Sequence, residues 1–296
     1  MKRVLITGVT GYIGSNLARA LLPDCEVYGL VREPLHTVYI ADIQDQISLL
    51  PYDGTLQSIS AALEKSRPDV VYHLAACYTG GHGPEKTPKL VSSNITLGAY
   101  LLEAMAGCGC SALVCASTIM AHYQGEKYRP LNLYAATKQA FSDLLVYYTD
   151  AGLLRAVTLV ISDTYGPGDR RPKILNLVGE AAQSGETLAL SDGGQDYDVV
   201  YIDDVVRAFR LAGEQLLQRP EWTDERFQIA ALEPLTLRQT VEKMLEINGL
   251  TLNAAWGQRP RPEREIRRAV RLFPPLPGWK PEVTPEEGLR KFTARP

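Results

Sequence analysis

The sequence contains no hydrophobic run long enough to cross a membrane and no excess of positive charge. Its 296 residues include 31 Lys and Arg against 34 Asp and Glu, which gives a formal net charge of −3 at pH 7. A membrane span needs about 20 consecutive apolar residues, and a nucleic-acid surface needs a basic field. We therefore expect neither a membrane nor a nucleic-acid partner. The N-terminus begins a strand directly and has no signal-peptide pattern, so we expect a cytoplasmic protein.

Cysteine is scarce and odd in number. The five residues lie mostly in apolar segments, which is typical of reduced thiols; they are Cys25, Cys77, Cys108, Cys110 and Cys115. Only one residue separates Cys108 from Cys110, and no second Cys or His cluster accompanies them, so we interpret the pair as a helix-end turn. We predict no metal site.

A glycine-rich loop stands at the start of the chain. Residues 1–8 have the pattern of a short buried strand, followed by Gly8, Gly11 and Gly14 and by an apolar-periodic helix over residues 13–22. Glycines at this spacing permit a tight turn, a close approach of the backbone to a phosphate, and close packing of helix on strand. The helix N-terminus attracts the anion. The loop predicts a dinucleotide pyrophosphate site made of Gly8, Thr10, Gly11, Tyr12, Ile13 and Gly14.

Strand and helix patterns alternate in the first half of the chain. We expect strands at residues 26–31, 70–75, 112–116 and 156–161, and helices at 56–65, 89–105 and 134–150. This alternation predicts an α/β fold with a doubly wound parallel sheet of the Rossmann type, which binds ligands beyond the carboxyl ends of its strands. Besides the glycine loop, residues that follow such strands are expected to line the dinucleotide site: Leu74, Ala75, Ala76 and Ser117.

The alternation weakens after residue 163, where Pro and Gly surround shorter helices expected at 174–183 and 237–248. We predict an NADP-binding Rossmann domain over residues 1–162 and a smaller C-terminal α/β domain over 163–296 that mainly binds substrate. Residues of about 195–218 are expected to return to the first domain, because a long helical pattern begins at Asp203.

The end of the second expected strand indicates which dinucleotide binds. An NAD site normally places an acidic residue there for the ribose 2′-hydroxyl, but this chain has Arg32. Because an arginine pairs with a 2′-phosphate, we favour NADP(H) over NAD. In the alternative, Arg32 is a solvated charge and Glu33 takes the acidic role. Asp53 and Gly54 are candidates for binding the adenine amino group, although Asp53 also suits a turn cap.

Tyr134 and Lys138 lie one helical turn apart on the same face. A phenol has an ordinary pKa near 10, and an adjacent ammonium together with a nicotinamide favours the phenolate and brings proton transfer within range. Upstream, a buried strand pattern ends in Ser117 and Thr118. A hydroxyl at that place is suited to donate a hydrogen bond to a carbonyl oxygen of the substrate.

These motifs, in this order, resemble the extended short-chain dehydrogenase/reductases of the nucleotide-sugar epimerase, dehydratase and ketoreductase branch. The matching segments cover nearly the whole chain: Gly8-x-x-Gly11-x-x-Gly14, His73-Leu74-Ala75-Ala76, Asn94, Ser117-Thr118, Tyr134-x-x-x-Lys138, Tyr165-Gly166-Pro167-Gly168-Asp169 and Tyr201-Ile202-Asp203-Asp204-Val205. The resemblance implies that Tyr134 is the acid/base, that Lys138 binds the ribose and tunes Tyr134, and that Thr118 orients the reacting oxygen, with Ser117 as the fallback. It also implies a homodimer.

Dehydratases of this family carry an Asp-Glu pair after the catalytic threonine, because elimination of water needs a further acid and base. Here Ile119 and Met120 follow Thr118, which argues against dehydration. Residues 162–174 resemble the corresponding segment of the CDP-abequose synthase type of reductase. We expect NADPH-dependent reduction of the C4 keto group of a nucleotide-linked 4-keto-6-deoxy or 3,6-dideoxy sugar. The alternatives are an NAD-dependent nucleotide-sugar 4-epimerase, a reductase of a carbonyl without a nucleotide, and a non-catalytic dinucleotide-binding sensor.

The expected partner is a nucleotide-diphosphate sugar. Many relatives have an Arg where this chain has Tyr197, so Arg171 and Lys173, with Arg261 or Arg259, are candidates to hold the diphosphate instead; the alternative is that they are solvated loop charges. Asp163 stands where epimerases often have asparagine, and either binds sugar hydroxyls or caps a turn. The predicted substrate residues are Tyr78, Thr118, Asp163, Thr164, Arg171, Lys173 and Arg261.

Overall fold

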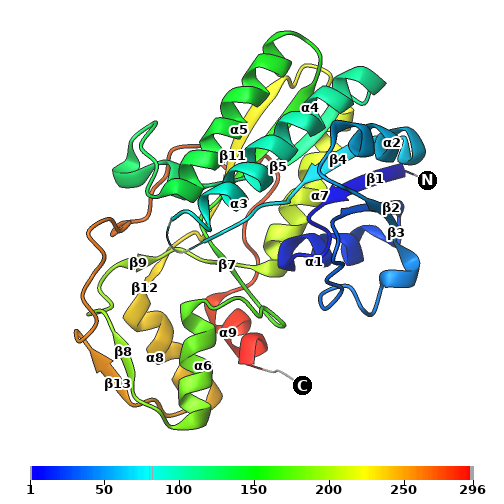
Figure 1. Ribbon diagram of the computed structural model, residues 1–296. Helices are drawn as coiled ribbons and strands as arrows, with labels where there is room; N and C mark the ends of the chain where they lie inside the picture. Colours follow the sequence, from blue (N-terminus) through cyan, green and yellow to red (C-terminus); the bar gives the residue numbers. More distant parts are fainter. Residues whose placement is uncertain (1, 80, 82, 294–296) are drawn as a thin grey trace.

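The computed structural model describes residues 2–79, 81 and 83–293 and shows the expected doubly wound α/β fold (Figure 1). Its main sheet is parallel, with the strands in the order β11-β6-β5-β4-β1-β2-β3. These strands are β1 (Lys2–Thr7), β2 (Cys25–Val31), β3 (Ser48–Pro51), β4 (Val70–His73), β5 (Ala112–Thr118), β6 (Arg155–Ile161) and β11 (Asp224–Ile229). The chain reverses its direction of winding between β1 and β4, which is where such a sheet binds its ligand.

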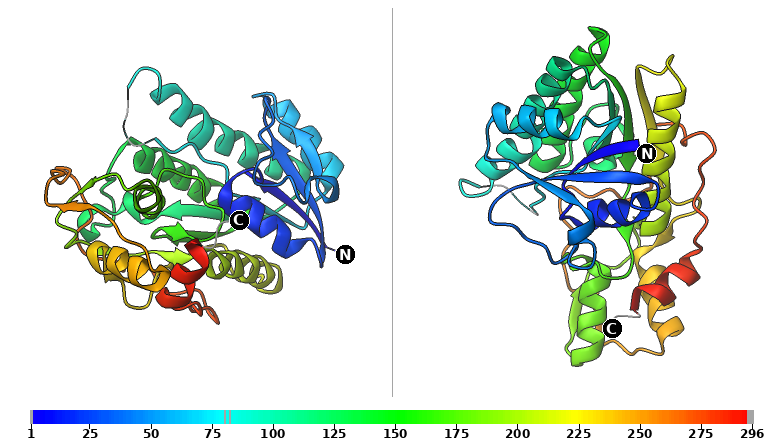
Figure 2. Two further views of the ribbon diagram at one scale, coloured as in Figure 1. Left: turned by 90° about the horizontal axis from the view of Figure 1, so that it is seen from below. Right: turned by 90° about the vertical axis from the view of Figure 1, so that its right-hand side faces the viewer.

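The sheet is buried on both faces. Alternate residues of β1 enter different cores: Val4 and Ile6 pack on one side and Leu5 on the other. Helices α1 (Tyr12–Leu21) and α7 (Ile202–Gln218) cover the first side. Helices α2 (Leu56–Ser66), α4 (Leu97–Cys108) and α5 (Leu133–Asp150) cover the second (Figure 2). Burial on both faces explains why these strands are continuous apolar runs.

The start of α5 is set by a local signal. Asn132 has extended backbone angles, and its side-chain oxygen accepts the N–H of Ala135 at 2.9 Å, which satisfies a free donor of the first turn. This cap places Tyr134 in the first turn of α5 and Lys138 one turn later.

The remaining elements form a smaller group around α6 (Ile174–Ser184), α8 (Leu237–Asn248) and α9 (Pro285–Thr293), at the bottom of Figure 1. Three two-stranded sheets accompany them, namely β7 (Thr164–Tyr165) with β10 (Val200–Tyr201), β9 (Asp196–Tyr197) with β12 (Leu235–Thr236), and β8 (Leu188–Leu190) with β13 (Ala254–Trp256). Thr236 and Gln239 form a capping box that begins α8.

Several features differ from the sequence prediction, among them the edge strand β3, which was not expected. The helix expected at residues 89–105 is divided into α3 (Thr87–Val91), a turn of π-helix over Ser92–Thr96, and α4. The edge strand β11 was not expected. It begins with the charged residues Asp224, Glu225 and Arg226, so the sequence does not show the alternation of apolar and polar residues that predicts a strand. Residues 202–229 thus return to the sheet, whereas the sequence placed the return at about 195–218. The boundary at residue 163 stays a prediction.

Within the described residues, no helix is long and apolar enough to span a membrane. The same part of the chain holds no group of three or more His, Cys, Asp or Glu side chains arranged for a metal ion.

Candidate active site

The glycine loop connects β1 to α1 and packs against the residues that follow β4. Gly8 has a φ of +74°, and a Cβ there would lie 2.7 Å from the backbone nitrogen of Ala75. The N–H of Leu74 donates to the carbonyl of Thr7 at 3.1 Å, and that of Ala75 to the Thr7 hydroxyl at 3.2 Å. The predicted cofactor residues 8 and 74–76 are therefore held against each other at the carboxyl edge of the sheet.

The N-terminus of α1 fits a pyrophosphate. Gly11 is the N-cap residue, and no side chain caps the first turn of α1. The free backbone N–H groups of that turn are therefore available to an anion. A Cβ on Gly14 would collide with the carbonyl oxygen of Gly8, so only glycine permits this packing. Thr10, Tyr12 and Ile13 complete the loop. The residues present thus fit the phosphates of a dinucleotide.

Arg32 directly follows β2 and is exposed, with one guanidinium nitrogen donating to the Ser93 hydroxyl at 3.1 Å. The carboxylate of Glu33 instead accepts the N–H of Leu35 at 3.1 Å, within its own loop. After β3, Asp53 accepts the N–H and the hydroxyl of Thr55 at 2.9 and 2.6 Å, which makes it a turn-stabilising residue beside Gly54. Hydrogen bonds from Thr55 and Ser58 lower the pKa of the Asp53 carboxyl.

The predicted catalytic residues lie at the ends of neighbouring elements. Thr118 ends β5, paired with Ile161 of β6, and its hydroxyl oxygen accepts the N–H of Met120 at 3.2 Å. This leaves the hydroxyl proton available to a substrate oxygen. Ser117 precedes it and pairs with Val160. The ring of Tyr134 meets the ring of Tyr78 edge-on, at 81° and a centroid separation of 5.0 Å.

Lys138 is only 3% exposed, and its Nζ lies 5.7 Å from the ring centre of Phe141. Burial lowers the pKa of its ammonium group. Burial, Tyr78 and Asp163 raise the pKa of the Tyr134 phenol, and Arg171 lowers it. From the sequence we expected Lys138 and a nicotinamide to favour the phenolate; the protein's own residues favour the protonated phenol.

Asn94, in the π-helical turn, ties the active-site elements together. Its side chain exchanges hydrogen bonds with the backbone of Cys77, at 2.7 and 3.0 Å, and donates to the Thr137 hydroxyl at 2.9 Å. It is 1% exposed. The sequence analysis named Asn94 only as part of a motif and did not predict that it links these segments. The sequence feature that could have predicted this is a polar residue on the same helix face as the buried Leu90 and Leu97.

Three of the four cations considered for the diphosphate are engaged in ion pairs. Arg171 binds both carboxylate oxygens of Asp169, at 2.7 and 2.5 Å. Lys173 is paired with Asp163, beside Thr164. Arg261 is paired with Asp192 and with Glu265, the latter at 2.9 Å. Among the described residues, these ion-pair partners of Arg261 do not include a residue of the Tyr134 site. A bound diphosphate has to share these cations with the carboxylates.

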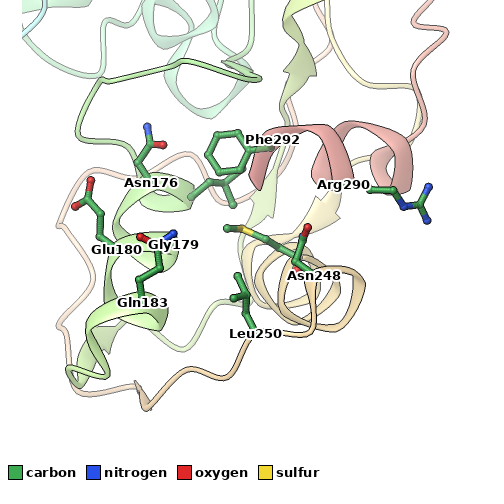
Figure 3. A pocket seen from close by; sticks show the side chains of 10 residues that line it. Asn176, Gly179, Glu180, Gln183, Asn248, Leu250, Arg290 and Phe292 are labelled. Carbon is green, nitrogen blue, oxygen red and sulfur yellow. The ribbon is translucent and has the colours of Figure 1, made fainter. Parts of the chain in front are cut away.

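A separate pocket of about 270 Å³ lies in the smaller group of elements, between α6, α8 and α9 (Figure 3). Its lining includes Gly179, Gln183, Met244 and Leu250. None of the predicted site residues lines this pocket.

The fold and the site together define an enzyme of the Rossmann type with a Tyr-x-x-x-Lys pair at the carboxyl edge of its sheet. The sequence model of the NAD dependent epimerase/dehydratase family matches residues 4–229, and the chain belongs to this family. The resemblance stated from the motifs is thereby confirmed.

Two proteins and one solved structure illustrate what this chain is similar to. CDP-abequose synthase of Yersinia pseudotuberculosis is 29% identical over 211 residues, 70% of this chain and 71% of that protein. UDP-glucose 4-epimerase of Mycolicibacterium smegmatis is 26% identical over 98% of this chain and 96% of its own. The crystal structure of the Thermus thermophilus UDP-glucose 4-epimerase in complex with NAD has a TM-score of 0.82 and 26% identity, and covers 98% of this chain and 97% of that one.

Proposed function

We propose that the protein reduces the C4 keto group of a nucleotide-linked 4-keto-6-deoxy or 3,6-dideoxy sugar with NADPH. The observation that carries this proposal is the end of β2, where Arg32 is exposed and Glu33 is engaged by its own loop. An arginine there favours a 2′-phosphate, and a reductase draws on the NADPH pool, whereas an epimerase retains its NAD.

The residues near Tyr134 supply what a ketone reduction needs. A bound reduced nicotinamide supplies the hydride. Thr118 donates a hydrogen bond to the carbonyl oxygen, and Tyr134 gives its Oη proton to the same oxygen as negative charge develops there. Lys138 binds the nicotinamide ribose and tunes Tyr134. Arg171 and Lys173, with Arg261, bind the diphosphate of the substrate.

The residue after Thr118 argues against dehydration. Ile119 is 6% exposed and packs with Val160 and Val270 in a small apolar cluster. A dehydratase needs a carboxyl group there to move a second proton, and this cluster does not tolerate an unpaired one.

A 4-epimerase is the second candidate. The observation that favours it is that several similar proteins spanning nearly the whole chain are UDP-sugar 4-epimerases, one of them in complex with NAD, although two CDP-abequose synthases span it as fully. CDP-abequose synthase supports the reductase instead. A cytoplasmic homodimer accompanies either proposal.

The deciding experiment follows the absorbance of reduced nicotinamide with purified protein, NADPH or NADH, and CDP-, dTDP-, GDP- and UDP-linked 4-keto-6-deoxy sugars. Stoichiometric loss of NADPH supports the reductase and identifies the nucleotide. The same protein is then given 4-hydroxy nucleotide sugars such as UDP-glucose; inversion at C4 with no net change in nicotinamide supports the epimerase. Tyr134→Phe is expected to lower kcat by about 10²–10⁴-fold with dinucleotide binding intact; full turnover by this variant overturns the assignment of Tyr134.

A further inference from the structure

The ammonium group of Lys138 lies over the aromatic ring of Phe141. Its Nζ is 5.7 Å from the ring centre, which is within the distance at which the negative face of an aromatic ring attracts a cation. The two residues are three positions apart in α5, so they share one side of the helix. Both are buried, and a contact shielded from water is the kind in which this attraction is strongest.

Two neighbouring elements hold the Phe141 ring in place. From β4, the ring of His73 packs against it at a centroid separation of 4.9 Å and an interplanar angle of 46°. From α4, the backbone of Gly98 lies so close that an added Cβ would be 2.8 Å from the Cε2 atom of Phe141. The missing side chain at Gly98 therefore leaves the room that the ring fills. Packed between β4 and α4, the ring keeps its face toward Lys138.

Within the described residues, no negative charge offsets the burial of this ammonium group. Burial lowers the pKa of Lys138, and the group that opposes this effect is the Cys115 thiol of β5 rather than a carboxylate. The other titratable groups nearby are His73 and, one turn earlier in α5, Tyr134. Burial lowers the pKa of His73 to about 3 and raises the pKa of Cys115 and of Tyr134, so all three are neutral at neutral pH. An aromatic face attracts an ammonium more than a neutral amine, so Phe141 favours the charged form of Lys138.

We propose that Phe141 is a positioning residue for Lys138: the face of its ring holds the ammonium group in place and keeps it charged. This inference rests on the proposed function, in which Lys138 binds the nicotinamide ribose and tunes Tyr134. A charged ammonium is a hydrogen-bond donor without an acceptor site, which suits the oxygens of the ribose hydroxyls. Its positive charge also stabilises the phenolate that Tyr134 becomes once it has given its proton to the substrate.

The direct test is NMR spectroscopy of the protein with isotopically labelled lysine and without dinucleotide, with Lys138→Met assigning the signal. The ring current of Phe141 is expected to shift the ε-methylene protons of Lys138 upfield, and Phe141→Leu should remove that shift. Replacing Phe141 by trifluorophenylalanine keeps the shape of the ring but weakens its negative face. We expect this variant to lower the pKa of Lys138 by about one pH unit.

The matched control is the same replacement at Phe209, which is fully buried in α7 on the other side of the sheet. It should leave the Lys138 signal and its pKa unchanged. The second measurement is the affinity for NADPH as a function of pH, followed by the fluorescence of bound reduced nicotinamide. The alkaline limb, where Lys138 loses its proton, is expected to move lower in the fluorinated Phe141 variant by the same amount as the pKa.

A lower pKa of Lys138 together with a limb that follows it supports the inference. A purely structural role of Phe141 weakens NADPH binding equally at every pH and leaves the pKa of Lys138 in place. That result overturns the inference, as does a limb that stays in place while the pKa moves. Neither measurement involves turnover, so a protein that passes both tests but reduces no 4-keto sugar overturns the proposed reduction alone.

Discussion

The guanidinium carbon of Arg171 lies 4.8 Å from the ring centre of Tyr12, so a residue of the segment between β7 and α6 stacks on a residue of the glycine loop. The Tyr12 hydroxyl donates to the carbonyl of Pro167 at 3.2 Å, which adds a second link between the two segments. Arg171 is also bound to Asp169, whose side chain is 1% exposed. Arg171 thus connects the glycine loop to a buried carboxylate in the segment between β7 and α6.

Arg171→Ala is expected to lower the free energy of unfolding by about 3 kcal/mol, because Asp169 loses the cation that offsets its burial. We take the lower part of the usual range because the arginine side chain is itself 34% exposed. Urea unfolding measures the change. Arg170→Ala, at the exposed neighbour, is the control and should change stability by less than about 0.5 kcal/mol. Equal losses in both variants contradict the role of the Asp169 pair.

Arg32→Ala is expected to raise the KM for NADPH about tenfold and to change the KM for NADH little, because a charge-assisted hydrogen bond contributes about 1.5–3 kcal/mol. Steady-state kinetics with both dinucleotides measure this. Glu33→Gln is the matched variant from the same loop, and it should leave both values near wild type. A loss of NADH affinity in Glu33→Gln instead assigns the ribose contact to Glu33.

Gly14→Ala is expected to abolish dinucleotide binding and to destabilise the fold by about 1–3 kcal/mol, since its methyl group would collide with the carbonyl of Gly8. The control is Gly107→Ala in α4, where a methyl group meets nothing within 4 Å. That variant should stabilise the protein by about 0.5–1 kcal/mol. Thermal unfolding and a dinucleotide titration on both variants provide the check. Normal binding by Gly14→Ala excludes the glycine loop as the phosphate site.

Local signals made much of this fold predictable. The glycine loop places the start of α1 within one residue of the expected position, and α5 also begins within one residue of its expected start, at the Asn132 cap that only the structure shows. The pairing of Arg261 with Asp192, 69 residues apart, was not predictable, since it depends on how distant loops meet. Strand β11 was missed because its charged first half lies at the edge of the sheet.

His73 makes the stability depend on pH. It ends β4, is fully buried, and its Nδ1 lies 2.8 Å from the hydroxyl of Thr7. Burial, with the charge of Lys138, lowers its pKa to about 3, whereas an unfolded histidine has a pKa of about 6.5. Between these values the unfolded chain binds a proton that the folded protein excludes. The free energy of unfolding therefore falls as pH drops below about 6.5, by about 1.4 kcal/mol per pH unit from this group.

His73→Asn should remove this dependence, because asparagine can keep the bond to Thr7 but does not titrate. Urea unfolding at about pH 7 and about pH 5 measures the slope, and comparing variants cancels the contribution of the other groups. His36→Gln, at an exposed histidine, is the control and should retain the wild-type slope. If His73→Asn loses as much stability as wild type over this interval, His73 is protonated in the folded protein and its burial does not exclude the charge.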